Sequence, residues 1–231
     1  DELSISIDYF DIEITDSIAT FSGGVANILN TCYTSAAGGI DSAQCNAVTR
    51  REDGSIQSVL APNENTALTE LSGVDIITDY AMEIAGGDMR INYLGTFLDN
   101  SSTTFPGNFE IDCTGKFGNV CGEPTPEYTH RMTVAWGMDD FDLQLLWRFI
   151  GSTDDDDDGA EYFRESTGSV SYFDLTGTYH VTEGVRLNAG VRNLFEREPL
   201  RFGNNAEQSN TWPATYDVFG RTFFVGVTTR F

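Results

Sequence analysis

The stretch GSTDDDDDGAEYFRE, residues 151–165, has the residue types and spacing of a calcium-binding loop. Such loops place carboxylates at alternating positions before a glycine and add a glutamate six residues after it. This spacing is met by Asp154, Asp156, Asp158 and Glu165. A run of aspartates is also typical of a solvated loop tip. The sequence therefore leaves open a weak Ca²⁺ site or an acidic loop tip, and it predicts no cofactor that the protein requires.

A second group of residues has the chemistry to bind a ligand by stacking and hydrogen bonding. The stretch 196–218 is rich in Asn and Gly, and its candidate ligand-binding residues are Arg201, Phe202, Trp212 and Tyr216. Aromatic rings beside polar groups can stack on a sugar or on a siderophore ring. The alternative is that these residues form an aromatic girdle at a membrane edge.

Sequence patterns of catalysis are absent. The chain contains no G-x-S-x-G, H-E-x-x-H or P-loop pattern. His130 and His180 have no nucleophile or metal ligand at motif spacing, so we expect both to be structural. The sequence therefore predicts no catalytic residues and no enzyme.

The charge balance restricts the partners. The chain has 36 acidic and 13 basic residues and a formal net charge of -23. Nucleic-acid binding needs clustered Lys and Arg, so we expect no nucleic-acid partner. The hydrophobic content of 40% is enough for a core, which favours one folded unit over a disordered chain. Acidic loops also disfavour anionic ligands by repulsion.

The four cysteines form two close pairs in Gly-, Asn- and Ser-rich stretches. Local pairing would join Cys32 to Cys45 and Cys113 to Cys121, which suits an oxidising compartment, whereas free thiols are the alternative. The C-x2-C spacing of a zinc site is absent. Apolar residues at helical spacing predict a short helix over residues 25–33, held by the first disulfide.

Apolar and polar side chains alternate along most of the chain, which is the pattern of two-faced β-strands. Residues 141–149 place Phe141, Leu143, Leu145, Trp147 and Phe149 on one face. Similar stretches near 3–9, 74–84, 89–97, 132–136, 173–179, 185–191 and 223–231 give about eight strands. Charged residues keep to the other face, and they are Asp75, Asp79, Glu83, Arg90, Arg131, Arg148, Asp174, Arg186 and Arg192.

The connections alternate between short and long. The short ones lie near 85–88, 138–140 and 182–184, and the long ones span 16–66, 99–127, 152–168 and 196–218. This is typical of outer-membrane barrels, which have short periplasmic turns and long extracellular loops. The sequence therefore predicts an all-β fold, an antiparallel transmembrane β-barrel segment with a lipid-facing apolar wall.

The C-terminal segment carries a family resemblance. VRLNAGVRNLFEREP, a loop, and then YDVFGRTFFVGVTTRF resemble the last two strands of TonB-dependent outer-membrane receptors. Those receptors end in a phenylalanine, here Phe231, which is the expected C-terminal assembly signal. Upstream, SISIDYFDIEITDSI, ILNTCY, LSGVDIITDY, NYLGTFLD and LQLLWRFIGS follow the order seen in the C-terminal part of that family.

The resemblance implies a function for the chain. Receptors of this family have barrels of about 22 strands around a plug domain, so residues 1–231 are expected to be the C-terminal portion of a barrel. The implied activity is TonB-dependent active uptake of a scarce large nutrient across the outer membrane of a Gram-negative bacterium. The expected partners are the rest of the barrel, the plug domain, the TonB complex through the plug, and outer-membrane lipid and lipopolysaccharide.

The nutrient and the extent of the protein stay open. The acidic loops favour a neutral oligosaccharide over a ferric siderophore, and cobalamin is a further candidate. The chain begins directly in a strand-like run, as expected of a mature product or a fragment. One alternative is a stand-alone outer-membrane barrel of eight strands, the lower limit for such barrels. Another is a secreted calcium-binding β-sandwich.

Overall fold

The computed structural model describes residues 2–34, 41–105, 109–157, 159, 161–203, 206 and 209–230. Its regular structure is mostly antiparallel β-sheet, which confirms the all-β prediction. Contacts divide the chain into two compact units, one with residues 1–10, 73–99 and 114–231, and one with residues 11–72 and 100–113. Among the described residues, no helix is long and apolar enough to cross a membrane.

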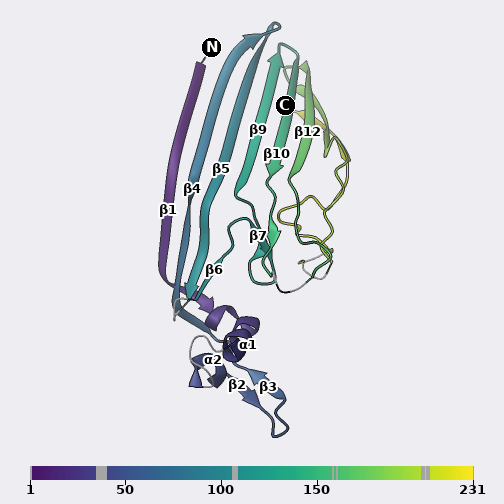
Figure 1. Ribbon diagram of the computed structural model, residues 1–231. Coiled ribbons are helices and arrows are strands. Elements are labelled where there is room, and N and C mark those ends of the chain that lie inside the picture. Colours follow the sequence, from purple (N-terminus) through teal and green to yellow (C-terminus); the bar gives the residue numbers. More distant parts are fainter. Residues whose placement is uncertain are drawn as a thin grey trace. The chain divides into compact units, whose positions relative to one another are not determined.

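A nine-stranded sheet is the largest element (Figure 1). Its strands are β1 (Glu2–Thr20), β4 (Asn63–Ile84), β5 (Gly87–Phe105), β9 (Tyr128–Met138), β10 (Phe141–Ile150), β12 (Val170–Thr182), β13 (Val185–Arg192) and β14 (Thr222–Thr229), paired in that order. The ninth strand, β6 (Phe109–Asp112), pairs with β5. The eight strands of the main path lie where alternation predicted them.

The turns between successive strands are short where the sequence predicted them. β4 and β5 are joined through Ala85 and Gly86, which both have positive φ, 54° and 76°. A positive φ is accessible to glycine without cost and reverses the chain within two residues. Two residues also separate β9 from β10 and β12 from β13.

The smaller unit holds the loop end of β1, β4 and β5 together with short elements. These are η1 (Phe21–Gly23), α1 (Val25–Thr34), α2 (Ala43–Asn46) and the hairpin of β2 (Val48–Arg50) and β3 (Ile56–Val59). α1 confirms the predicted helix, and the Cys32–Cys45 disulfide joins it to α2. Ile28, on α1, is fully buried.

In the larger unit the strand register separates an apolar face from a polar face. Leu145 pairs with Val134 on β9 and with Leu175 on β12, so apolar side chains stand beside one another across three strands. Neighbouring Arg148 pairs with Arg131, which puts both arginines on the opposite face. We call these the outer and the inner face.

The outer face carries a belt of rings toward the loop end of the strands. Tyr128 stacks on Phe97 with ring centroids 4.5 Å apart, and His130 stacks on Phe149 at 5.1 Å. Trp147 and Phe173 extend the belt, with ring centroids 5.5 Å apart. Aromatic rings gather in this way at the edges of the lipid-facing band of outer-membrane barrels. On β14, outward side chains stay exposed, such as Val225 at 81%.

Loops of the larger unit build a second, small sheet. It consists of β11 (Asp154–Asp155), β7 (Lys116–Gly118) and β8 (Gly122–Thr125). β11 lies parallel to β7, although the two strands belong to different long loops. Beside this sheet lies the cluster of buried apolar residues described below, so the core of this unit lies where its loops meet the start of β12.

Candidate functional site

The inner face is a wall of polar side chains, some of which bond to one another across neighbouring strands. The Asp75 carboxylate accepts a hydrogen bond of 2.6 Å from the Thr96 hydroxyl, and Asn92 donates to Asp79. These contacts link β4 to β5 as cross-strand pairs, as expected for ladder residues on a barrel wall. Some predicted inner-face residues therefore have structural partners.

Arg148 is the centre of the strongest contact on this wall. Its guanidinium donates two hydrogen bonds to the Asp217 carboxylate, at 3.1 and 2.7 Å, and lies 3.8 Å from Asp174. It also stacks over the Tyr172 ring, 4.9 Å from the centroid. The Tyr172 hydroxyl in turn accepts a bond of 3.2 Å from the Asp217 backbone N–H. A planar, two-pronged contact of this kind fixes both partners in direction.

Because Asp217 belongs to the last long loop, this contact fastens the loop to the inner wall. A groove of about 700 Å³ opens beside it, lined among others by Arg148, Asp174, Arg192, Asn193 and Asp217. Both positive and negative side chains occur in this lining. The groove can therefore receive a polar or charged group from the lumen.

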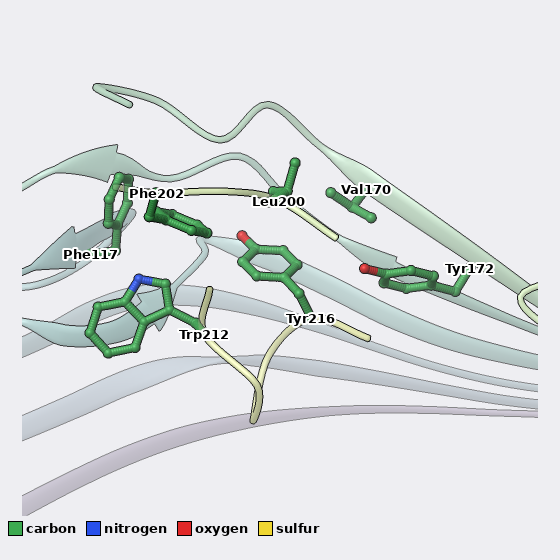
Figure 2. Packing of buried hydrophobic residues seen from close by; sticks show 7 residues of the cluster. All are labelled: Phe117, Val170, Tyr172, Leu200, Phe202, Trp212 and Tyr216. Atoms are coloured by element: carbon green, nitrogen blue, oxygen red, sulfur yellow. The ribbon is translucent and has the colours of Figure 1, made fainter. Parts of the chain in front are cut away.

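Three of the four predicted ligand-binding residues lie in a buried cluster in the loops, shown in Figure 2. Phe202 is 0% exposed, Trp212 is 7% exposed and Tyr216 is 1% exposed. The cluster consists of Phe117, Val170, Tyr172, Leu200, Phe202, Trp212 and Tyr216. Its rings pack edge to face and in parallel, as between Phe117 and Phe202 at 5.0 Å.

This packing occupies the ring faces that a ligand would need. Arg201 is the exception among the predicted set, because its side chain is exposed. The cluster also differs from the membrane girdle that was the alternative, since the girdle position is held by strand residues of the outer belt. Ligand binding by these loop residues stays a prediction.

Burial changes the chemistry of Tyr216. Burial raises the pKa of its hydroxyl above the ordinary value of 10.0, because a phenolate would lose its hydration in the cluster. Tyr216 is therefore neutral at physiological pH.

The acidic loop uses its carboxylates to shape the chain. Asp156 accepts hydrogen bonds from the backbone N–H groups of Val120, at 2.8 Å, and Cys121, at 2.6 Å. Glu165 accepts from the Tyr162 N–H, and Asp154 is exposed on β11. In the part of the chain that the structure describes, no three acidic, His or Cys side chains converge as metal ligands.

Two predicted residues, Asp158 and Phe231, lie outside the described residues. All four cysteines are disulfide-bonded, which confirms the expected use of disulfides. The S–S bond of Cys32–Cys45 closes a loop of 13 residues.

Both histidines have partners that motif spacing could not reveal. His130 stands in the outer belt, where its Nδ1 lies 2.9 Å from the Tyr128 hydroxyl. The Nε2 atom of His180 lies 2.7 Å from the Asp142 carboxylate. The sequence offered no signal for the pair of His180 and Asp142, because it depends on the register between two strands. Tyr128 and His130 are two residues apart on β9, so strand alternation alone puts them on one face.

Comparison with known proteins identifies a family and several relatives that are similar to this chain. The profile of the family described as "TonB dependent receptor-like, beta-barrel" matches residues 1–194. The ferrienterobactin receptor of Escherichia coli K12 is 25% identical over 188 residues, which cover 74% of this chain and 25% of that protein. A ferric enterobactin receptor of Pseudomonas aeruginosa is 31% identical over 117 residues, 46% of this chain and 16% of that protein.

Solved structures agree on the fold. The crystal structure of the ferric enterobactin receptor from Pseudomonas aeruginosa, in a G324V mutant, superimposes with a TM-score of 0.61 at 19% identity. That superposition covers 99% of this chain and 29% of the receptor. The ferric-catecholate import receptor of Escherichia coli K12 gives a TM-score of 0.54 at 16% identity, over 99% of this chain and 25% of that receptor.

The chain thus spans about a quarter of the length of the first of these relatives. The matching family and the superimposed structures have a β-barrel fold, so the β-sandwich of the third interpretation is wrong as a fold. Because the family profile covers well over half of its residues, the chain belongs to the TonB-dependent receptor-like β-barrel family.

Proposed function

We propose that the chain forms the C-terminal part of the barrel of a TonB-dependent outer-membrane transporter that takes up a ferric siderophore of the catecholate type. The observation that carries this proposal is the pair of relatives named as enterobactin receptors in two organisms, at 25% and 31% identity. Those names favour a siderophore over the oligosaccharide that the acidic composition predicted, and they give no support to cobalamin.

The net charge of -23 does not oppose an anionic ferric chelate, because a ligand responds to nearby charges more than to a total. Arg131, Arg148 and Arg192 all lie on the inner face, where a chelate would pass. Arg148 is paired with Asp217, whereas Arg131 carries no hydrogen bond or ion pair among the described contacts. Unpaired guanidinium groups on the wall would attract an anion.

The proposal includes the surroundings of the barrel. The outer face lies in the outer membrane of a Gram-negative bacterium and contacts lipid and lipopolysaccharide. Further strands complete the barrel, and the inner face lines its lumen. There it contacts a plug domain, through which the TonB complex supplies energy. The large loops, with their disulfides, lie outside the cell in this arrangement.

Uptake of radiolabelled iron tests the substrate. A strain lacking the gene should lose uptake of a ferric catecholate, and a plasmid copy should restore it only when TonB is present. Growth on oligosaccharides as sole carbon source should not depend on the gene. Normal ferric-catecholate uptake without the gene, together with lost growth on an oligosaccharide, would return the substrate to the saccharide class.

A further inference from the structure

A groove outside the barrel wall combines arginines with exposed aromatic rings. It measures about 620 Å³ and is lined by Phe163, Arg164, Phe195, Glu196, Arg197, Glu198, Pro199, Leu200 and Arg201. Phe163 is 76% exposed and Phe195 is 70% exposed, so both rings face solvent or lipid and not the loop cluster. The inner-face groove beside Arg148 shares none of these residues.

The turn that follows β13 sets the position of Phe195. Asn193 has a positive φ of 52° and is 2% exposed. Its side-chain amide accepts a bond of 2.7 Å from the Arg197 N–H and donates one of 2.8 Å to the Arg197 carbonyl. The turn directs Phe195 against Phe173 of the outer belt, with ring centroids 5.2 Å apart in a T-shaped contact. The groove therefore opens next to the lipid-facing side of the wall.

The charge of the groove runs against that of the chain. Arg164, Arg197 and Arg201 line it, and Arg221 lies 3.5 Å from the lining residue Glu196. These four arginines are among only 13 basic residues in a chain of net charge -23, and they stand against two glutamates. Positive charge is concentrated at this place.

The arginines differ in how firmly they are held. Arg164 donates from Nε to the Arg201 carbonyl at 2.7 Å and lies over the Phe202 ring, 5.7 Å from its centroid. The Arg164 guanidinium is therefore held in place at the base of the groove. Arg197 and Arg201 have exposed side chains, for which the described contacts include no acceptor of a guanidinium bond. Their donors are available to a ligand.

We propose that this groove binds the phosphate groups of a glycolipid in the outer leaflet. Guanidinium groups bind phosphate through paired, charge-assisted hydrogen bonds, and basic pockets beside a membrane wall take anionic lipid headgroups. Phe163 and Phe195 then lie at the boundary between headgroups and acyl chains, where aromatic rings are favoured. This inference rests on the membrane orientation in the proposed function, but not on the identity of the transported chelate.

Binding to the native protein, extracted from outer membranes, tests the groove. The protein is titrated with lipid A carrying both phosphates and, separately, with the same lipid after dephosphorylation, and the bound fraction is read by native mass spectrometry. Arg197→Gln with Arg201→Gln should weaken binding of the phosphorylated lipid by roughly tenfold or more, because each arginine near an anionic surface contributes a several-fold gain. The dephosphorylated lipid should bind weakly to both proteins.

The matched control replaces two exposed arginines of the β2–β3 hairpin, Arg50→Gln with Arg51→Gln, and should leave lipid binding unchanged. Arg197→Lys with Arg201→Lys should give intermediate binding, because charge remains and the paired geometry is lost. Unchanged migration of unboiled protein on gels confirms that each variant is folded. No siderophore is present, so an error in the transported substrate leaves these results intact.

Three results would overturn the inference. One is equal weakening by the control pair, which would mean a general charge effect. Another is equal binding of the lipid with and without phosphates. The third is complete competition by inorganic phosphate at concentrations comparable to the lipid, which would indicate a site for a soluble anion and not for a lipid.

Discussion

Single side chains decide where the loops of this chain go, and Asn193 is the clearest case. Its backbone N–H donates a hydrogen bond of 2.8 Å to the Asp174 carboxylate, and its side-chain amide makes two hydrogen bonds to the backbone of Arg197. Asparagine tolerates the left-handed conformation better than most residues because its side chain satisfies the local backbone. The residues RNLF within the C-terminal segment VRLNAGVRNLFEREP thus have a physical reason in the turn that they build.

We expect Asn193→Ala to destabilise this turn more than Asn193→Gly does. Both variants lose the two side-chain hydrogen bonds in a buried place, at a cost of about 1–3 kcal/mol. Alanine adds the cost of a left-handed backbone, roughly 1–2 kcal/mol, which glycine avoids. Urea unfolding of the three proteins measures the difference. Equal midpoints for Asn193→Ala and the unchanged protein would refute this account of the turn.

Tyr216 predicts how the loop cluster responds to pH. Burial raises the pKa of its hydroxyl in the folded state above the ordinary 10.0. The stabilisation that depends on the neutral phenol is therefore complete below pH 10.0 and is lost as the pH rises through the folded value. Absorbance titration should show a fraction of the tyrosines ionising late, and Tyr216→Phe should reduce the amplitude of that late fraction by one tyrosine. If Tyr216→Phe titrates like the unchanged protein, the raised pKa of Tyr216 is contradicted.

Strands and loops differ in how far their sequences predict them. β10 and β13 could be recognised because apolar and polar residues alternate over several positions, which indicates a β-strand with two different faces. The pairing of β11 with β7 could not be predicted from the sequence. These strands have only two and three residues, too few to show an alternating pattern, and they come from different loops. The Arg148 to Asp217 contact spans 69 residues, so no local pattern encodes it.

The contact between Arg148 and Asp217 should hold the last loop on the inner wall. Asp217→Asn keeps the size of the side chain but removes its charge. Because both side chains are about 30% exposed, we expect a loss of about 1 kcal/mol and faster proteolysis within residues 196–218. Glu196→Gln breaks a more exposed ion pair with Arg221 and is the control. Equal cleavage rates for the two variants would show that the contact does not hold the loop.

The acidic loop makes a prediction about calcium. The Asp156 carboxylate already accepts two backbone N–H groups, so Asp156→Ala should lower stability by about 1–3 kcal/mol through their loss. We expect the same loss with and without calcium, and calorimetric calcium heats that Asp154→Ala and Glu165→Ala do not change. Heats that vanish in these variants would restore the calcium-site interpretation.

At the scale of the whole molecule, the two faces of the sheet account for the composition. An apolar outer face and a charged inner face allow a chain with 21% charged residues to line a membrane wall. The predicted fold class depended on this separation and is confirmed by register. The nutrient could not be predicted in the same way, because a total charge says nothing about where the arginines lie.

Neighbouring positions of β12 test the wall directly. Leu175→Arg puts a charge on the outer face and should cost roughly 2–4 kcal/mol near the middle of the membrane, lowering the amount of assembled protein. Thr176→Arg, one residue along on the inner face, should assemble normally because that face is wet. Assembly is measured as heat-modifiable migration of protein from outer membranes. Equal assembly of both variants would contradict the two-faced wall.

The parallel contact between β11 and β7 also has a consequence for the order of folding. Asp155 pairs with Phe117, which lies 38 positions earlier in the chain, and β9 and β10 lie between them in sequence. Contacts of such long range form only after the intervening chain has been ordered, because closing a long loop costs entropy before any contact repays it. We therefore expect the loop sheet to form after the β9–β10 hairpin. It should also be the first part to open, leaving the hairpin intact while proteases already cut the loops.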